Sequence, residues 1–223
     1  MALKETVLNQ CLNFQSNPNG WVWQKTKKQY KRQLFPNTAL CIDPVISFNS
    51  YRGLFQPHVR VLYKPYQKLY KKIGFPNTFD YCWNFKIGMY YEKYPSSILI
   101  WEELPQDNRE AWYSIDAVPR VLETMVDKGS EILETELNLS SEELFVNSMI
   151  LDVNDPRLDE PRYSNNVGLL NQGLLNLMQG NVDYIYMMQD RFKQRGGLHL
   201  KYVPIIIKLI EDQGIESLLD NTV

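Results

Sequence analysis

Long hydrophobic runs are absent from this 223-residue sequence. No window approaches the roughly 18 uninterrupted apolar residues of a membrane-spanning helix, so we expect no membrane segment. The first residues place Lys4 beside Glu5 without an apolar core, which predicts no secretory signal. Cysteine is scarce, with three widely spaced thiols and no CxxC pair. This usage predicts buried cysteines and a reduced, cytoplasmic setting.

Residues that carry common chemistry are also scarce. The two histidines, His58 and His199, each stand alone in the sequence. No glycine-rich phosphate loop, nucleophile elbow, HExxH motif or calcium loop occurs, and soft ligands are too few for a zinc site. We therefore predict no metal site, no cofactor and no catalytic residue. An enzyme of unrecognised type remains as an alternative.

Charge is unevenly distributed along the chain. Residues 1–100 contain 14 Lys and Arg against 4 Asp and Glu, whereas residues 101–223 contain 10 against 22. The first hundred positions also hold 19 of the 28 aromatic residues. This uneven distribution of charge allows three arrangements. The two parts neutralise each other, each part presents its electrostatic field to a binding partner, or the basic part binds nucleic acid.

The hydrophobic periodicity of the first part predicts a helix and several strands. Apolar residues from Leu3 to Phe14 recur at helical spacing, and we expect a tight turn at Asn17-Pro18-Asn19-Gly20. Later segments alternate with period two or return to helical spacing. The expected elements are a strand or hairpin arm from Trp21 to Lys27, a strand over 39–48 interrupted at Asp43-Pro44, a strand over 58–63, a helix over 64–73, a strand over 81–91 and a short strand over 97–102.

The second part has a helical pattern. A helix is expected to start between Ser114 and Val118, because Pro119 is tolerated only in a first turn. Ser141 before two acids predicts another helix start. A loop is expected over 152–162, and further helices are expected after it, with a break at Gly196-Gly197.

These patterns predict an α+β protein. We expect an antiparallel sheet of about five strands with flanking helices over residues 1–150, followed by a C-terminal helical subdomain over residues 151–223. No repeat at a fixed period and no low-complexity tract is present.

Two groups of side chains are candidate partner contacts. On a strand, Trp21, Trp23, Lys25 and Lys27 share one face, which either contacts a partner or places its tryptophans in the core. A short helix carries a lysine face that either contacts a partner or keeps the helix solvated. Its members are Lys64, Lys68, Lys71 and Lys72.

The order of these segments resembles a group of uncharacterised bacterial proteins. The resemblance rests on a short helix, Trp21-Val22-Trp23 leading into a basic strand, the strand Ala39-Leu40-Cys41-Ile42, and Gln56-Pro57-His58-Val59-Arg60-Val61. Those proteins pair a mixed sheet with later helices, and some lie beside toxin genes as candidate immunity proteins. The resemblance covers about residues 5–135 and transfers no functional residue. It implies a cytoplasmic binding protein without catalysis.

The leading functional expectation is therefore a non-enzymatic, cytoplasmic protein-interaction protein, immunity-like, that binds a protein partner through a charged and aromatic surface. The main alternative is a nucleic-acid-associated protein that uses the basic N-terminal half. The sequence does not predict an oligomeric state.

Overall fold

The computed structural model describes residues 3–14, 20–49, 51–75, 80–91, 93–107, 109–160, 163, 166–195 and 202–220. The chain divides into two compact units, each built from separate stretches of sequence. The first unit comprises residues 1–34, 39–60 and 85–136, and the second comprises residues 35–38, 61–84 and 137–223. The expected boundary after residue 150 lies in the second unit, just after a helix that ends at Met149, and it stays a prediction.

The predicted α+β class and its antiparallel five-stranded sheet are confirmed. Along the sheet the strands follow the order β1-β2-β3-β6-β7. Their bounds are β1 Val22–Gln24, β2 Gln29–Gln33, β3 Thr38–Asp43, β6 His58–Tyr63 and β7 Trp83–Lys86. Tyr30 lies opposite Trp23 on β1 and Ile42 on β3, which fixes the register of the first three strands.

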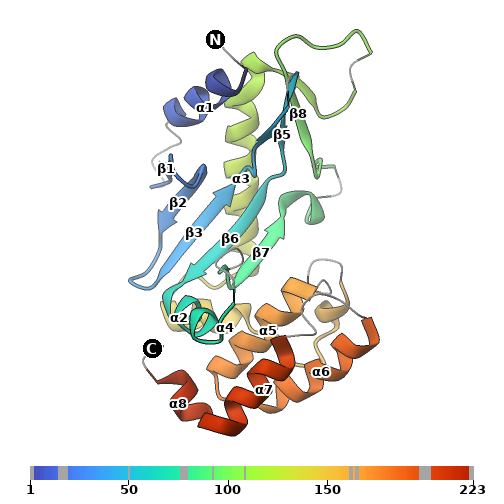
Figure 1. Ribbon diagram of the computed structural model, residues 1–223. Coiled ribbons are helices and arrows are strands. Elements are labelled where there is room, and N and C mark those ends of the chain that lie inside the picture. The colour runs from blue at the N-terminus through green and yellow to red at the C-terminus, as the bar shows by residue number, and fades with distance from the viewer. Residues whose placement is uncertain are drawn as a thin grey trace. The chain divides into compact units, whose positions relative to one another are not determined.

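Two helices of the first unit pack on one face of this sheet. They are α1 (Leu3–Asn13) and α3 (Val118–Glu136), and Figure 1 shows α3 running behind the strands. The Tyr30 hydroxyl donates to the Cys11 carbonyl of α1 over 3.3 Å. At Gly129 of α3 an added Cβ would lie 2.8 Å from the Ile42 side chain, so the helix approaches β3 closely because this residue is glycine. Pro119 is the second residue of α3, as its position in a first turn predicts.

The first unit also contains a four-stranded mixed sheet that the sequence patterns did not predict. Its order is β4-β5-β8-β9, with β8 and β9 parallel. The bounds are β4 Ser47–Phe48, β5 Arg52–Phe55, β8 Ile98–Trp101 and β9 Trp112–Ser114, followed by the 3₁₀ turn η3 Ile115–Ala117. One face is buried, with Gly53, Phe55, Ile98 and Ile100, and α1 packs against β5.

The second unit is mainly helical. Ser141 accepts the Leu144 N–H over 3.2 Å and caps the helix that follows, as predicted. The described elements are α2 Lys64–Lys72, α4 Glu142–Met149, the 3₁₀ turn η4 Pro156–Asp159, α5 Asn166–Met178, α6 Asp183–Arg195, α7 Tyr202–Gln213 and α8 Ile215–Leu219.

Buried amides hold α5 in this unit. Asn171, Gln172 and Asn176 are all buried among the leucines of the helix. Gln172 accepts the Leu151 N–H over 2.9 Å and donates to the Met149 carbonyl over 2.9 Å. Asn176 donates to the Leu151 carbonyl over 3.2 Å. These bonds pair backbone N–H and carbonyl groups at and just after the end of α4, where no further helical turn supplies hydrogen-bond partners.

Several predicted elements agree closely with the structure. The strand over 58–63 is β6, the helix over 64–73 is α2, and the strand over 97–102 contains β8. Asp43-Pro44 ends β3, so the interruption expected within 39–48 separates two strands of different sheets.

The strand predicted over 81–91 is wrong beyond Lys86. There β7 ends and a 3₁₀ turn, η2 Ile87–Met89, follows, with the Ile87 N–H donating to the Pro57 carbonyl over 2.9 Å. An added Cβ at Gly88 would lie 2.8 Å from the Ser96 backbone. The chain turns here because glycine allows the two backbones to meet, which alternation of side chains does not reveal.

Some expectations fall outside the described residues. These are the turn at Asn17-Pro18-Asn19, the break at Gly196-Gly197 and His199. Within the described residues, no helix combines the length and the apolar character needed to span a bilayer.

Candidate functional site

The predicted contacts of the first strand lie on a hairpin. β1 is only three residues long, and the chain reverses over residues 25–28, where the Lys28 N–H donates to the Gln24 carbonyl over 2.7 Å. The expectation that Lys25 and Lys27 share a strand face with the tryptophans is therefore wrong: both lysines are exposed in the turn. Lys28 adopts a positive φ of 53°, which closes this turn.

The two tryptophans of the hairpin face the interior. Trp21 is 6% exposed, and its ring lies 5.2 Å from the Arg32 guanidinium. Trp23 is half-buried, with its ring centroid 4.9 Å from that of Tyr30. The structure thus puts Trp21 in the core, whereas partner contact by Lys25 or Lys27 stays a prediction.

The lysine face of α2 is exposed in the second unit, as its spacing predicts. Lys64 donates to the Pro36 carbonyl over 2.8 Å, and Lys72 donates to the Ser217 carbonyl over 2.6 Å. Two of its four members, Lys64 and Lys72, therefore bind backbone oxygens of their own unit. Lys68 and Lys71 are exposed as well, and their role as partner contacts stays a prediction.

The three cysteines are buried, as their usage predicts. Burial raises the pKa of the Cys11 and Cys41 thiols to about 12, and it also raises the pKa of Cys82. A thiol that stays protonated near neutral pH is a poor nucleophile and a poor metal ligand. The three cysteine side chains therefore contribute to the packing of the interior.

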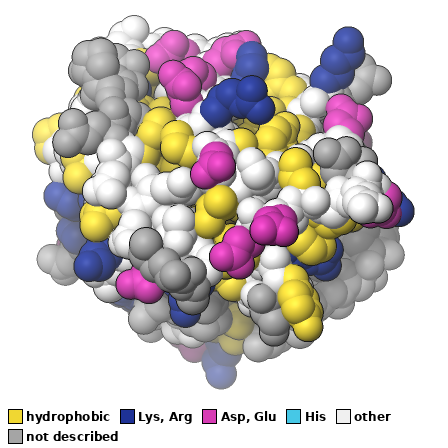
Figure 2. Space-filling model, turned by 90° about the horizontal axis from the view of Figure 1, so that it is seen from above, with side chains coloured by type: hydrophobic (Ala, Val, Ile, Leu, Met, Phe, Trp, Pro, Cys, Tyr) yellow, Lys and Arg dark blue, Asp and Glu magenta, His cyan; other side chains and the backbone are white. Residues whose placement is uncertain are grey.

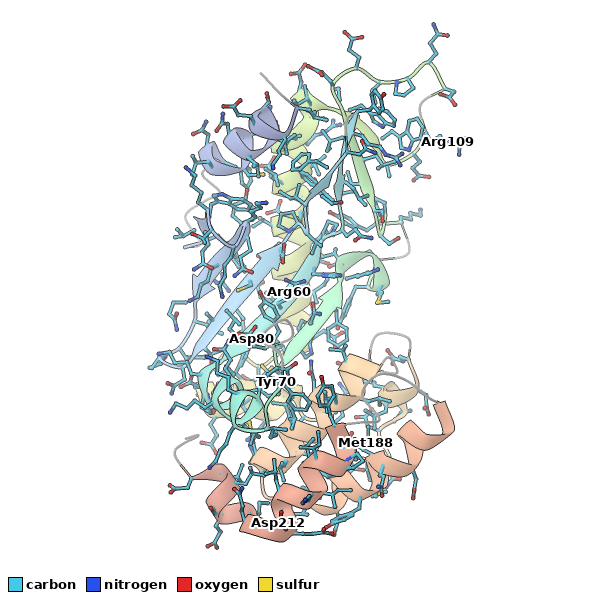
Figure 3. The ribbon with its side chains drawn as sticks, in the orientation of Figure 1. Arg60, Tyr70, Asp80, Arg109, Met188 and Asp212 are labelled. Carbon is cyan, nitrogen blue, oxygen red and sulfur yellow. The ribbon has the colours of Figure 1, made fainter. Side chains whose placement is uncertain are left out.

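His58 belongs to a polar cluster on β3 and β6. Arg60, which Figure 3 labels on β6, forms an ion pair with Asp43 and donates to His58 Nδ1 over 3.1 Å. Burial, then Arg60 and Lys86, lower the pKa of His58 to about 3. The imidazole is thus neutral at pH 7 and accepts a hydrogen bond, so it lacks the pKa near operating pH that general acid–base work requires.

A different surface of the first unit gathers tryptophan and arginine. On the β4-β5-β8-β9 sheet, Arg52 lies directly opposite Trp101, and Leu99 lies opposite Trp112. The two indole rings are 5.2 Å apart, the Arg52 guanidinium is 5.6 Å from the Trp101 ring, and the Arg109 guanidinium is 5.7 Å from the Trp112 ring. We name this surface the tryptophan face; it comprises Arg52, Leu54, Leu99, Trp101, Arg109 and Trp112.

The side chains of the tryptophan face that lie on strands are half-buried, whereas the opposite side of the same sheet is in the core. Each cation–π contact contributes about 0.5–1 kcal/mol and an aromatic pair about 0.5–1.5 kcal/mol, so the rings are held before any partner arrives. Arg109 projects from the segment between β8 and β9 (Figure 3).

The indole N–H of Trp101 is a buried donor without an acceptor in the described part of the chain. Trp101 also lines an open hollow of about 420 Å³ together with Tyr51, Glu102, Glu103 and Pro105. Tyr51 is 76% exposed at its rim. The face of the molecule that is seen from above has hydrophobic side chains interspersed with acidic and basic ones (Figure 2). The site offers ring surface, guanidinium groups and one unsatisfied donor.

The sequence analysis missed the tryptophan face, because its members lie in four separate stretches. Trp101 and Trp112 meet through parallel pairing of β8 and β9, and β9 is only three residues long. The available signal was the enrichment of Trp and Arg between residues 101 and 112, which are interface residue types.

The charge split of the chain disappears within the two units. The first unit contains 13 basic and 13 acidic residues, and the second contains 11 and 13. Each unit thus combines basic segments from the N-terminal half with acidic segments from the C-terminal half. The local exception is the hairpin over residues 20–34, which carries five cations and no acid.

Comparison with known proteins adds no relative: no family model matches the chain, and neither a curated protein nor a solved structure gives a significant match. Among the residues that the structure describes, no group of three or more His, Cys, Asp or Glu could hold a metal ion.

Proposed function

We propose that this chain is a non-enzymatic, cytoplasmic protein-interaction protein and that the tryptophan face is its partner-binding surface. The observation that carries the proposal is the clustering of the Trp101 ring with the Arg52 guanidinium and the Trp112 ring on a half-exposed sheet face, where the Trp101 indole N–H has no acceptor among the described residues. Tryptophan, tyrosine and arginine dominate interface hot spots because they bury large areas at low entropic cost.

The occupant of this surface is a protein segment that presents apolar side chains and an oxygen acceptor. The rings and leucines supply apolar area, and a backbone carbonyl or side-chain amide oxygen would satisfy Trp101 Nε1. Glu102 and Glu103 line the hollow beside it and disfavour an acidic segment there. The resemblance to candidate immunity proteins implies a bacterial toxin protein as the class of partner.

Binding of single-stranded nucleic acid has less support. Such binding stacks bases on exposed aromatic rings beside cations. In the basic hairpin, however, Trp21 and Tyr30 are buried and Trp23 is half-buried against Tyr30, so the exposed lysines have little ring surface beside them.

Selection of phage-displayed random peptides on the full chain tests the proposal. We expect enriched peptides to be rich in apolar residues and to lose binding to Trp101→Ala by tenfold or more, as about 2 kcal/mol at a hot spot implies. Trp23→Ala, a half-buried tryptophan of the hairpin in the same unit, serves as the matched control and should retain binding.

Failure to enrich any peptide, or enriched peptides that bind Trp101→Ala as well as the original chain, contradicts the proposal. Loss of binding in Trp23→Ala alone would move the interface to the hairpin. Thermal unfolding of both variants confirms that each is folded.

A further inference from the structure

The first unit contains another, smaller hollow that the proposed protein interface does not use. Its volume is about 260 Å³, and its walls come from residues 93–95, β8, β9 and the first two turns of α3. Ile98 and Val121 form an apolar wall, and Lys93, Tyr94 and Arg120 supply polar groups. Sites for drug-sized ligands span about 300–1,000 Å³, so this hollow suits a smaller molecule.

The polar groups of the hollow all favour an anion. Lys93 and Arg120 are exposed, and among the residues that the structure describes neither forms an ion pair and no acid lines the hollow. The Tyr94 hydroxyl is buried without a hydrogen-bond partner in the described residues. Because a buried hydroxyl with no partner costs free energy, its presence beside two cations points to a ligand that accepts a hydrogen bond.

Burial raises the pKa of Tyr94, with Tyr113 adding to the shift. The phenol therefore keeps its proton at neutral pH and acts as a donor.

We propose that this hollow binds the phosphate monoester of a small organic molecule. A phosphate dianion matches the two positive charges of Lys93 and Arg120, whereas a carboxylate would leave one of them uncompensated. The Tyr94 hydroxyl donates to a phosphate oxygen, and the short carbon chain of the ester packs against Ile98 and Val121. This site goes beyond the proposed protein interaction and shares no residue with the tryptophan face.

Isothermal titration of the full chain with propyl phosphate tests this inference. We expect saturable binding at one site per chain. Butyrate, a monoanion of similar shape, should bind about tenfold or more weakly, and 1-propanol should not bind, since charge-assisted hydrogen bonds supply most of the affinity. Inorganic phosphate should bind more weakly than the ester, because it leaves the apolar wall unused.

Variants locate the binding. Arg120→Gln and Tyr94→Phe should each weaken propyl phosphate about tenfold, which is the loss of one hydrogen bond to a charged group. Lys4→Gln removes one exposed cation from α1 of the same unit and should leave the affinity unchanged. Lys93→Gln removes the other exposed cation of the hollow and tests its contribution in the same way. Thermal melting verifies that each variant is folded.

Absence of propyl phosphate binding at millimolar concentration overturns the inference. An equal loss of affinity in Lys4→Gln and Arg120→Gln overturns it too, since that result indicates a general electrostatic effect. Unchanged affinity in Tyr94→Phe shows that the buried hydroxyl does not face the ligand and likewise contradicts the site.

Discussion

The two units treat their buried polar groups differently. In the second unit, the three buried side-chain amides of α5 all have hydrogen-bond partners: Gln172 and Asn176 bond to the backbone after α4, and Asn171 accepts from the Tyr66 hydroxyl. In the first unit, five buried polar atoms lack a partner within the described residues: Gln10 Oε1, Trp21 Nε1, Arg32 Nε, Tyr94 Oη and Trp101 Nε1. Because such atoms cost stability, the ones that belong to residues lining a hollow are candidate contacts for the ligands proposed above.

This contrast assigns different roles to the units. The second unit gains stability from its amide bonds, whereas the first presents unsatisfied donors at three hollows, which lie beside Trp101, Tyr94 and Arg32. Three sets of unfolding measurements and one spectroscopic measurement can break or sharpen the comparison.

The largest effect is expected at Gln172. Gln172→Ala leaves the Leu151 N–H and the Met149 carbonyl unpaired in the interior and creates a cavity. We expect a loss of about 3 kcal/mol in the free energy of unfolding. Urea denaturation measures it, with Gln179→Ala, an exposed glutamine beyond the end of α5, as the matched control. Equal effects of the two substitutions would show that the buried amide contributes no more than an exposed one.

A pH effect of about 2 kcal/mol is expected from His58 in the first unit. The folded pKa of His58 is lowered from 6.5 to about 3, so between these values the unfolded chain binds a proton that the folded chain does not. The free energy of unfolding therefore falls as the pH drops below 6.5, by about 2 kcal/mol at pH 5.

Urea denaturation of the original chain and of His58→Gln at pH 7 and pH 5 isolates this contribution. Asp43 and Arg60 are present in both chains, so their contributions cancel in the difference. The original chain should lose about 2 kcal/mol more than the variant between the two values. An identical loss in both would show that His58 does not titrate as its surroundings imply.

A smaller effect on the free energy of unfolding is expected when a helix glycine of each unit is replaced by alanine. Gly129→Ala places a Cβ 2.8 Å from Ile42 and 2.9 Å from Val59, which should cost about 1–2 kcal/mol. At Gly173 of α5 the nearest atom is 3.3 Å away on Ile185, so the gain in helix propensity, about 0.5–1 kcal/mol, should offset most of the strain. Thermal unfolding compares the two. A stabilising Gly129→Ala would contradict the close approach of α3 to β3.

Elements whose burial follows a regular period were predictable from sequence. In α3, Val121, Leu122 and Met125 repeat at helical spacing and are buried, and in β6, Val59 and Val61 alternate with polar residues. The period is visible in sequence because the same core covers the whole element.

Features that depend on pairing between distant segments were not predictable. Trp101 reaches Trp112 only through the register of β8 and β9, and Gln172 finds its partners only after α4 has placed Leu151 beside α5. Likewise, the turn after β1 depends on the positive φ of Lys28, and a lysine in the sequence does not predict a positive φ. The predicted site therefore lay on the basic hairpin, whereas the proposed interface lies on the second sheet.

The indole N–H signal of Trp101 in the proton–nitrogen NMR spectrum tests the central claim most directly. The signal is assigned by its absence in Trp101→Phe and is followed as an enriched peptide is added to the full chain. We predict that it moves downfield as Nε1 gains an acceptor, with a larger shift than the signal of the buried Trp21. A peptide that binds while the Trp101 signal stays in place would contradict the assignment of the tryptophan face as the interaction surface.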